Sequence, residues 1–221
     1  MSGAGTGPTP GAPGGIGRLW LVRHEPARAP ANACVGWLDL PLAAPDAART
    51  HMQRLAQHMG HVDQVYASDL VRAHDTATYL AAALGCPLQL RRGLRELSFG
   101  AWEGLTWAQI QAADRNRYAR FMTGWHDTPT PHGESYAALA TRVAEVWNEL
   151  SAEALRAQLA VVAHAGSLRV LAGLILGWSP DEVMARDLHP GHAGLIELDP
   201  REPALVRWNW HPDDRDEDER R

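Results

Sequence analysis

Two short apolar runs, each followed by a histidine, constrain the fold of this chain more than any other feature. Residues 18–22 (RLWLV) and 159–163 (LAVVA) lack the alternation of a strand with one solvated face. Such runs are typical of strands covered by helices on both faces of a mostly parallel sheet. The first run leads into Arg23 and His24, and the second into His164. Because ligands bind outside the carboxyl ends of strands in open α/β sheets, we expect both histidines in one pocket.

The rest of the chain reads as further elements of one α/β domain. Periodicity marks strands at 62–67, 194–198 and 204–210, and helices at 46–59, 68–84, 136–155 and 168–176. The helix at 68–84 is expected to begin at a cap formed by Ser68 and Asp69, and the last two strands are expected to be antiparallel. With 221 residues the chain suits a single core. We therefore predict a three-layer α/β/α sandwich: a mostly parallel sheet with helices on both faces.

Both ends of the chain differ from this core in composition. We expect a disordered Gly- and Pro-rich tail at 1–17, a single domain at 18–211 and a charged tail at 212–221. The first 17 residues lack the basic and apolar segments of a secretory signal. The two cysteines, Cys34 and Cys86, form no CxxC pair. These features favour a cytoplasmic protein without a disulfide framework.

Charge and hydropathy argue against two classes of partner. The chain has 21 Lys and Arg against 26 Asp and Glu, a net charge of -5, so it offers no basic field to nucleic acid. No stretch approaches the roughly 20 apolar residues that span a membrane. A small-molecule partner is the prediction, and the sequence leaves a homodimer open.

Two arginines near the paired histidines in the predicted fold indicate phosphoryl transfer as the reaction. A histidine at a strand end is more often structural, but a neutral imidazole is a competent nucleophile for phosphoryl transfer. That reaction also needs guanidinium groups on the phosphoryl oxygens, because the planar fork of arginine matches their geometry. Arg23 and Arg72 are the candidates, and Arg72 lies near the positive end of its predicted helix.

Six segments resemble the histidine phosphatase (phosphoglycerate mutase-like) superfamily, and they occur in the family's order. They are 21–24 (LVRH), 36–42 (GWLDLPL), 66–76 (YASDLVRAHDT), 94–104 (LRELSFGAWEG), 132–135 (HGES) and 161–166 (VVAHAG). The resemblance runs from about residue 18 to 198. It implies a phosphoglycerate mutase-like fold. We expect no cofactor.

The resemblance also implies a role for each matching residue. His24 matches the phosphorylated nucleophile, and Arg23, Arg72 and His164 match the residues that bind the phosphoryl group. Glu96 matches the general acid that protonates the leaving alkoxide, which is otherwise a poor leaving group. Glu103 is the second candidate for that acid. Either glutamate has a structural alternative, a salt bridge to Arg92 or Arg95.

One departure from the family pattern lies directly after His24. The usual signature continues with Gly and a downstream Thr and Asn, whereas Glu25, Pro26, Ala27 and Arg28 follow here. An anionic Glu25 beside the nucleophile would repel a phosphate ester unless its side chain turns away. Arg28 is a candidate to compensate for that charge.

The amino-acid sequence around Glu103 indicates the type of reaction and the kind of phosphate ester. Residues 99–104 (FGAWEG) resemble the phosphatase branch rather than the mutase branch, so hydrolysis is favoured. The loop 23–42, which contains Gly36, and the segment 99–110 resemble the group that acts on α-ribazole 5'-phosphate in cobalamin biosynthesis. An aromatic wall would suit a benzimidazole base. The candidate substrate-binding residues are Arg23, Arg72, His164, Arg28, Gly36, Trp37, Trp102, Glu103 and Gly166, and Trp107 and Trp125 lie in nearby loops.

Other functions remain open at this point. A broad-specificity sugar or small-metabolite phosphatase, a phosphoglycerate mutase and a catalytically weak phospho-ligand-binding relative would each carry much of the same pattern. A metal site is disfavoured: His58 with His61, or His189 with His192, are close in sequence, but no HExxH motif, cysteine partner or dense carboxylate spacing accompanies them.

Overall fold

A computed structural model describes residues 16–214 of the chain. The predictions for residues 1–15 and 215–221 lie outside the described residues. A six-stranded sheet forms the centre of the fold, in the order β3-β2-β4-β1-β5-β6. The strands are β1 (Gly17–Arg23), β2 (Gln64–Ala67), β3 (Leu88–Leu90), β4 (Gln158–Ala163), β5 (Ala193–Leu198) and β6 (Ala204–Trp210).

The pairing of the strands confirms a mostly parallel sheet. The four strands β3, β2, β4 and β1 are parallel to one another, β5 is antiparallel to β1, and β6 is antiparallel to β5. Arg23 at the end of β1 lies opposite Ala163 at the end of β4. This register brings the residues that follow the two strands to the same edge of the sheet.

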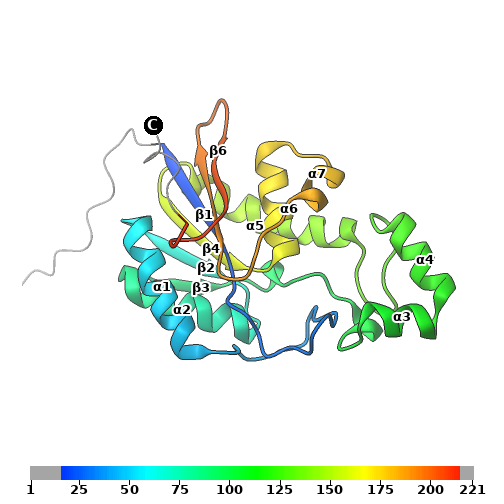
Figure 1. The fold of residues 1–221 in the computed structure, drawn as a ribbon. Coiled ribbons are helices and arrows are strands. Elements are labelled where there is room, and N and C mark those ends of the chain that lie inside the picture. Colours follow the sequence, from blue (N-terminus) through cyan, green and yellow to red (C-terminus); the bar gives the residue numbers. More distant parts are fainter. Residues whose placement is uncertain (1–15, 215–221) are drawn as a thin grey trace, which may run out of the picture.

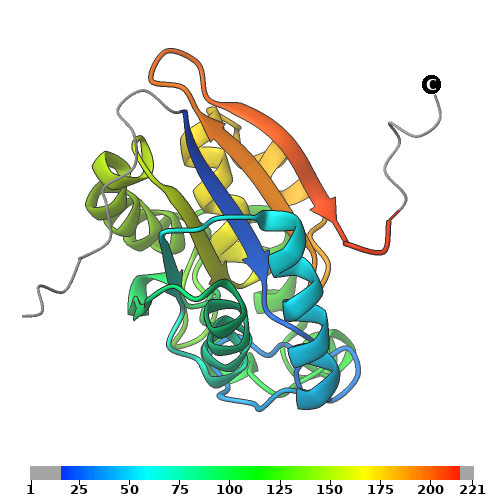
Figure 2. The ribbon, with the colours of Figure 1, turned by 90° about the vertical axis from the view of Figure 1, so that its left-hand side faces the viewer.

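Helices cover both faces of the sheet, so the three-layer sandwich is confirmed (Figures 1 and 2). One face carries α1 and α2, and the other carries α5, α6 and the short α7. The helices are α1 (Pro45–Met59), α2 (Val71–Leu84), α3 (Trp107–Ala113), α4 (Arg115–Gly124), α5 (Tyr136–Ala154), α6 (Ala165–Leu176) and α7 (Pro180–Ala185). Two 3₁₀ turns, η1 (Arg92–Leu94) and η2 (Gly100–Trp102), lie between β3 and α3.

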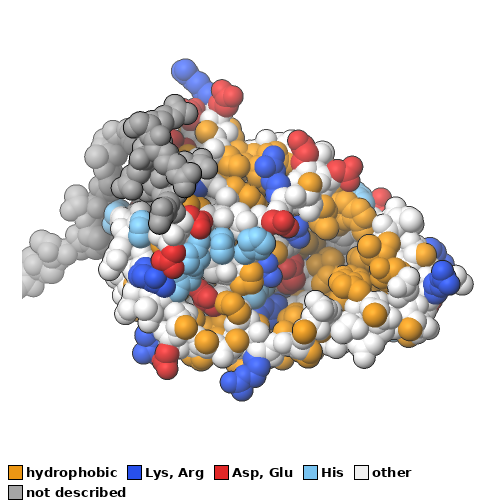
Figure 3. Space-filling model, in the orientation of Figure 1, with side chains coloured by type: hydrophobic (Ala, Val, Ile, Leu, Met, Phe, Trp, Pro, Cys, Tyr) orange, Lys and Arg blue, Asp and Glu red, His pale blue; other side chains and the backbone are white. Residues whose placement is uncertain are grey.

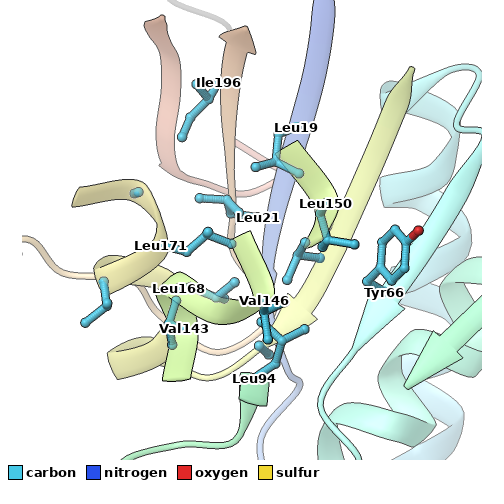
Figure 4. Packing of buried hydrophobic residues seen from close by; sticks show 14 of the residues in the cluster. Leu19, Leu21, Tyr66, Leu94, Val143, Val146, Leu150, Leu168, Leu171 and Ile196 are labelled. Atoms are coloured by element: carbon cyan, nitrogen blue, oxygen red, sulfur yellow. The ribbon is translucent and has the colours of Figure 1, made fainter. Parts of the chain in front are cut away.

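Two hydrophobic clusters fill the space between the layers. On one face of β1, Leu19 and Leu21 pack with α5 and α6 (Figure 4). On the opposite face, Trp20 and Val22 pack with α1 and α2. The side chains of β1 alternate between the two clusters because successive residues of a strand point to opposite faces. An apolar run without polar alternation is what such a strand requires.

The helices α3 and α4 stand apart from the sheet (Figure 1). They enclose a third, smaller cluster, whose buried members are Cys34, Trp102, Ile110 and Phe121. A backbone bridge between Ala33 and Thr106 joins this region to the loop that follows β1. Neither helix was predicted, since both are short and their residues are mostly exposed.

The start of α2 differs from the prediction. The residue before its first turn is Leu70, without a side-chain cap, instead of Ser68 and Asp69. Both predicted capping residues have other partners: the Ser68 hydroxyl meets His164, and Asp69 forms a two-pronged ion pair with Arg95. Within residues 16–214, no helix combines the length and the apolar composition needed to cross a membrane.

Candidate active site

The structure brings His24 and His164 together at the carboxyl edge of the sheet. Their ring centroids are 5.0 Å apart and their planes meet at 62°. His24 is 7% exposed and His164 is fully buried. The His24 backbone N–H donates to the carbonyl oxygen of Ala163, the last residue of β4. The pairing of the two strands therefore sets the distance between the two rings.

The environment of His24 keeps its imidazole neutral. Burial, and then the adjacent Arg72 guanidinium, lower the pKa of His24 to about 3, although the hydrogen bond to Glu25 acts in the opposite sense. His24 Nδ1 lies 2.6 Å from the carbonyl oxygen of Glu25. A carbonyl oxygen only accepts, so Nδ1 carries the proton and Nε2 carries the lone pair. Arg72 Nε donates to that Nε2 over 3.2 Å.

His164 is held beside this ring in the neutral state as well. Its Nε2 lies 2.9 Å from Ser68 Oγ, and its Nδ1 has no hydrogen-bond partner within the described residues. Burial lowers the pKa of His164 well below its ordinary value, and the neighbouring His24 and Arg72 lower it further. The Nδ1 atom is thus a buried polar group that a bound phosphoryl oxygen would satisfy.

Two arginines give the site its positive charge. Arg72 is 1% exposed, and its Nη1 and Nη2 donate to the carbonyl oxygens of Leu38 and Gly36, each over 2.7 Å. Arg23 Nη1 donates to the Leu188 carbonyl oxygen over 2.6 Å, and its Nε has no partner among the described residues. Both guanidinium groups are fixed by backbone carbonyls, so they form a prepared anion site.

Glu96 faces the same site from the segment after η1. One carboxylate oxygen accepts from the Leu97 backbone N–H over 2.9 Å, and the other from the Gly166 N–H over 3.1 Å. Gly166 is in the first turn of α6, and a Cβ there would lie 2.1 Å from Glu96 Oε1. The Glu96 carboxylate can occupy this position because residue 166 is a glycine without a side chain.

Two neighbouring cavities meet at Glu96, Phe99 and Trp107. The first has a volume of about 410 Å³, and the predicted residues that line it are Arg23, His24, Gly36, Arg72 and Glu96. The second has a volume of about 270 Å³ and is mostly apolar. Its lining comes from α3 to α7 and includes Trp107, Phe121, Met122, Trp125, Tyr136, Leu139, Val183, Met184, Gly166 and Arg169. Figure 3 shows hydrophobic side chains gathered around a hollow between α7 and the α3–α4 pair.

Five predicted substrate-binding residues do not line either cavity: His164, which is fully buried beside His24, and the four described next. Trp102 is 5% exposed and packs inside the third cluster, against Phe121. Trp37 lies beneath several arginines and donates from Nε1 to the Glu96 carbonyl oxygen over 2.6 Å. Glu103 accepts from the backbone N–H groups of Trp37 and Phe99, so it holds loops together. Arg28 is exposed to solvent.

Glu25, the residue that departs from the family pattern, is turned away from the site. Its side chain is buried and contacts His51 Nδ1 on α1. The Glu25 carboxylate therefore does not line the cavity that holds His24, and Arg28 is exposed and lines neither cavity.

The sequence did not single out several residues that shape the site. Arg142 on α5 donates to the carbonyl oxygens of Arg95 and Glu96 and pairs with Glu134. It therefore fixes the backbone that carries Glu96. Arg169 on α6 lines the apolar cavity. Neither had a local signal, because each acts on a segment far away in the chain.

The histidines outside the site have partners of other kinds in the described part of the chain. Within residues 16–214, no group of three or more His, Cys, Asp or Glu side chains is placed to hold a metal ion. His61 pairs with Asp63, and His58 Nδ1 meets the Arg54 carbonyl oxygen. His189 and His192 lie with ring centroids 5.3 Å apart.

Comparison with known proteins gives consistent matches along the chain. The sequence profile of the histidine phosphatase superfamily (branch 1) matches residues 19–211. The chain is similar to the adenosylcobalamin/alpha-ribazole phosphatase of Escherichia coli K12, with 29% identity over 76% of this chain and 82% of that protein. Among solved structures, a putative alpha-ribazole-5'-P phosphatase of Escherichia coli gives a TM-score of 0.80 with 26% identity, over 89% of this chain and 97% of that chain. The mycobacterial glucosyl-3-phosphoglycerate phosphatase gives 0.74 with 26% identity, over 88% and 99%.

Proposed function

The chain belongs to branch 1 of the histidine phosphatase superfamily and is a phosphatase, and from this premise we propose that it hydrolyses α-ribazole 5'-phosphate through a phosphohistidine at His24. The observation that carries the chemistry is the state of His24. Its ring is neutral and its Nδ1 proton is engaged by a carbonyl, so Nε2 carries the lone pair, which leaves the Arg72 N–H and turns to phosphorus when the ester binds. That is the state in which an imidazole attacks phosphorus.

In the first step the phosphoryl group lies between the two guanidinium groups. Arg23 and Arg72 bind its equatorial oxygens, and His164 Nδ1, when it carries the ring proton, donates to a third oxygen. Nε2 of His24 attacks phosphorus in line with the ester oxygen, and the P–O bond to the leaving group breaks. Glu96 in its acid form gives its proton to that oxygen, so the alcohol leaves neutral.

In the second step water takes the place of the alcohol. The Glu96 carboxylate removes a proton from the water as its oxygen attacks the phosphohistidine. The N–P bond breaks, inorganic phosphate leaves, and both His24 and Glu96 return to their starting states. Fixed arginines stabilise the charge in both steps without reorganisation, and this is the main electrostatic contribution of the protein.

The apolar cavity next to Glu96 supports the choice of substrate. An ester bound at His24 directs its leaving group toward Glu96, and the second cavity opens from that point between Phe99 and Trp107. Its aromatic walls suit a flat benzimidazole base better than the hydroxyl groups of a sugar. The similarity to alpha-ribazole phosphatase in sequence and in structure agrees with this choice.

A panel of phosphate esters with free phosphate as the readout tests the proposal. We expect the highest kcat/KM for α-ribazole 5'-phosphate, above ribose 5-phosphate and 3-phosphoglycerate. A preference for sugar phosphates would favour a broad-specificity enzyme, as the similarity to a glucosyl-3-phosphoglycerate phosphatase also would. Conversion of 3-phosphoglycerate to 2-phosphoglycerate faster than phosphate release would identify a mutase.

Trapping the intermediate tests the nucleophile separately. Wild type quenched during turnover of labelled substrate is expected to carry acid-labile phosphate, and His24→Ala is expected to carry none. Label that persists in His24→Ala contradicts the assignment of the nucleophile. An inert wild type that still binds phosphate would indicate a phospho-ligand-binding relative.

A further inference from the structure

The backbone of Glu25 determines how the nucleophile is oriented. Its carbonyl oxygen accepts the Nδ1 proton of His24 over 2.6 Å, and its N–H donates to Thr76 Oγ1 over 3.1 Å. A shift of this peptide would turn the His24 ring or release its proton to the other nitrogen. The position of Glu25 therefore matters to His24 although the Glu25 side chain faces away from the site.

The Glu25 side chain is anchored on a helix by a buried partner. It contacts Nδ1 of His51 on α1, and the two residues are 8% and 7% exposed. Gly191 packs against this contact: with φ of +78°, a Cβ there would lie 2.9 Å from Glu25 Oε1 and 3.0 Å from the His51 ring. The Gly191 N–H also donates to the carbonyl oxygens of Arg23 and His24. The pair is thus packed against the backbone of the nucleophile itself.

The charge of Glu25 has a direct consequence for substrate binding. A phosphate monoester bound at His24 is a dianion, and Glu25 is the next residue in the chain. A buried Glu25 carboxylate without a partner would oppose binding of that dianion, because charges inside a protein are screened weakly. His51 Nδ1 meets the Glu25 carboxylate oxygen directly, so the carboxylate is hydrogen-bonded instead of unpaired. His51 therefore has both a geometric and an electrostatic effect.

Further ionisable groups surround His51 on the side that faces the end of β6. The ring of His211 stacks on His51 with centroids 4.4 Å apart, and His192 follows 5.0 Å from His211. Burial lowers the pKa of His211, and His51 and His192 lower it further, whereas Asp213 and Asp214 act in the opposite sense. Figure 3 shows histidine side chains gathered on this face. The Glu25–His51 contact is the inner end of this row.

We propose that His51 and the Glu25 side chain form a positioning pair for the nucleophile. The contact fixes the carbonyl that orients His24, and it holds the carboxylate in a hydrogen bond that faces away from the phosphoryl group. The pair replaces the small residue that usually follows the nucleophile in this family. The inference rests on the proposed function, in which His24 attacks phosphorus.

A double-mutant cycle separates the two effects. Glu25→Gln keeps an acceptor for His51 without the charge, and we expect kcat/KM to fall less than in His51→Ala. His51→Ala leaves the carboxylate unpaired, and kcat/KM should fall about 10- to 100-fold, as when other supporting partners of active-site ligands are removed. The inhibition constant of inorganic phosphate should rise in parallel. The double variant Glu25→Gln with His51→Ala should recover part of the loss in kcat/KM and part of the loss in phosphate binding, because its buried carboxylate charge is gone.

The pH dependence gives a readout that a loss of packing would not change. An unpaired Glu25 carboxylate stabilises the charged form of His24, so the acidic limb of kcat/KM should move to higher pH in His51→Ala and return in the double variant. His58→Ala is the matched control, because His58 is exposed on the same helix α1. Thermal denaturation of each variant reports on folding.

The outcomes distinguish this inference from the proposed function. If wild type neither binds phosphate nor forms a phosphohistidine, the proposed function fails. If wild type does both and His51→Ala matches it in rate, phosphate inhibition and pH limb, the positioning pair is wrong. A double variant no better than His51→Ala, with the same acidic limb and thermal stability, reduces His51 to a packing role and also overturns the proposal.

Discussion

At the scale of single residues, the site depends on groups held in unusual states by their surroundings. Burial and Arg72 keep the His24 ring neutral, and Glu25 fixes its proton on Nδ1, which is the state that the proposed nucleophile needs. Glu96 owes its place to two backbone N–H groups. The carboxylate of Glu103, the other candidate acid, accepts hydrogen bonds from backbone N–H groups of neighbouring loops. Geometry therefore favours Glu96 for the acid role.

Substitution of the two glutamates distinguishes their roles. Glu96→Gln should lower kcat about 10²- to 10⁴-fold for alkyl esters such as ribose 5-phosphate. The loss should be much smaller for p-nitrophenyl phosphate, because its leaving group needs no proton. Glu103→Gln is expected to affect both substrates alike, through the loops that it holds. Steady-state kinetics on the two esters test this, and equal losses in Glu96→Gln would contradict the acid assignment.

At the scale of elements, the site is built where the ends of strands and helices meet. The start of α6 supplies a backbone donor to Glu96, and the loop after β1 carries one wall of the cavity that holds His24. The helices α3 and α4 contribute apolar side chains from outside the sheet. Two substitutions test what these helices contribute.

Gly166→Ala probes the first turn of α6. The added methyl would lie 2.1 Å from Glu96 Oε1, so the carboxylate must move. We expect kcat for alkyl esters to fall about as far as in Glu96→Gln, with phosphate binding retained. Ala165→Gly, one residue earlier in the same turn, is the control for backbone effects. Wild-type turnover in Gly166→Ala would show that the acid does not depend on this contact.

Met122→Gln probes the apolar cavity on α4. Met122 lines that cavity and is 52% exposed. Loss of apolar contact worth about 1 kcal/mol should raise KM for α-ribazole 5'-phosphate about fivefold and leave ribose 5-phosphate unchanged. Leu174→Gln is the control, since Leu174 is 43% exposed on α6 and lies outside both cavities. Equal effects on both esters would separate this cavity from substrate choice.

The sequence predicted the elements that carry a strong periodicity, and it missed those that do not. Every predicted strand and helix is present, because buried runs and amphipathic stripes are local signals. The strand β3, only three residues long, and the helices α3, α4 and α7 are short and depend on tertiary contacts. The same limit applies to the site. Its histidines and arginines follow from motifs, whereas the positions of Trp37, Trp102 and His51 depend on folding.

At the scale of the whole molecule, the burial of His24 and His164 makes the free energy of unfolding depend on pH. Burial lowers the pKa of His24 to about 3, and it lowers that of His164 well below the ordinary 6.5. In the unfolded chain both groups regain a pKa near 6.5 and take up protons below that pH. The unfolded state then binds more protons than the folded state. The free energy of unfolding must therefore fall as the pH is lowered from about 6.5 toward 3.

Denaturant unfolding at a series of pH values measures this effect. Each histidine that is neutral when folded and charged when unfolded contributes a slope of at most ~1.4 kcal/mol per pH unit. His24→Gln removes one such group, so its free energy of unfolding should depend less steeply on pH between 6 and 4. His58→Gln, at an exposed position, should leave the slope unchanged. A wild-type slope that His24→Gln does not alter would contradict the neutral state of the nucleophile.

The third hydrophobic cluster has a consequence for how such enzymes diversify. One side of the aromatic cavity comes from α3 and α4, which have a core of their own, while its other side and the strands that carry Arg23 and His164 pack on the sheet clusters. Mutations in the small core can reshape the leaving-group pocket while the catalytic framework stays folded. After gene duplication, one copy is then free to drift toward a new ester without losing the reaction. Selection can act on what is hydrolysed separately from how.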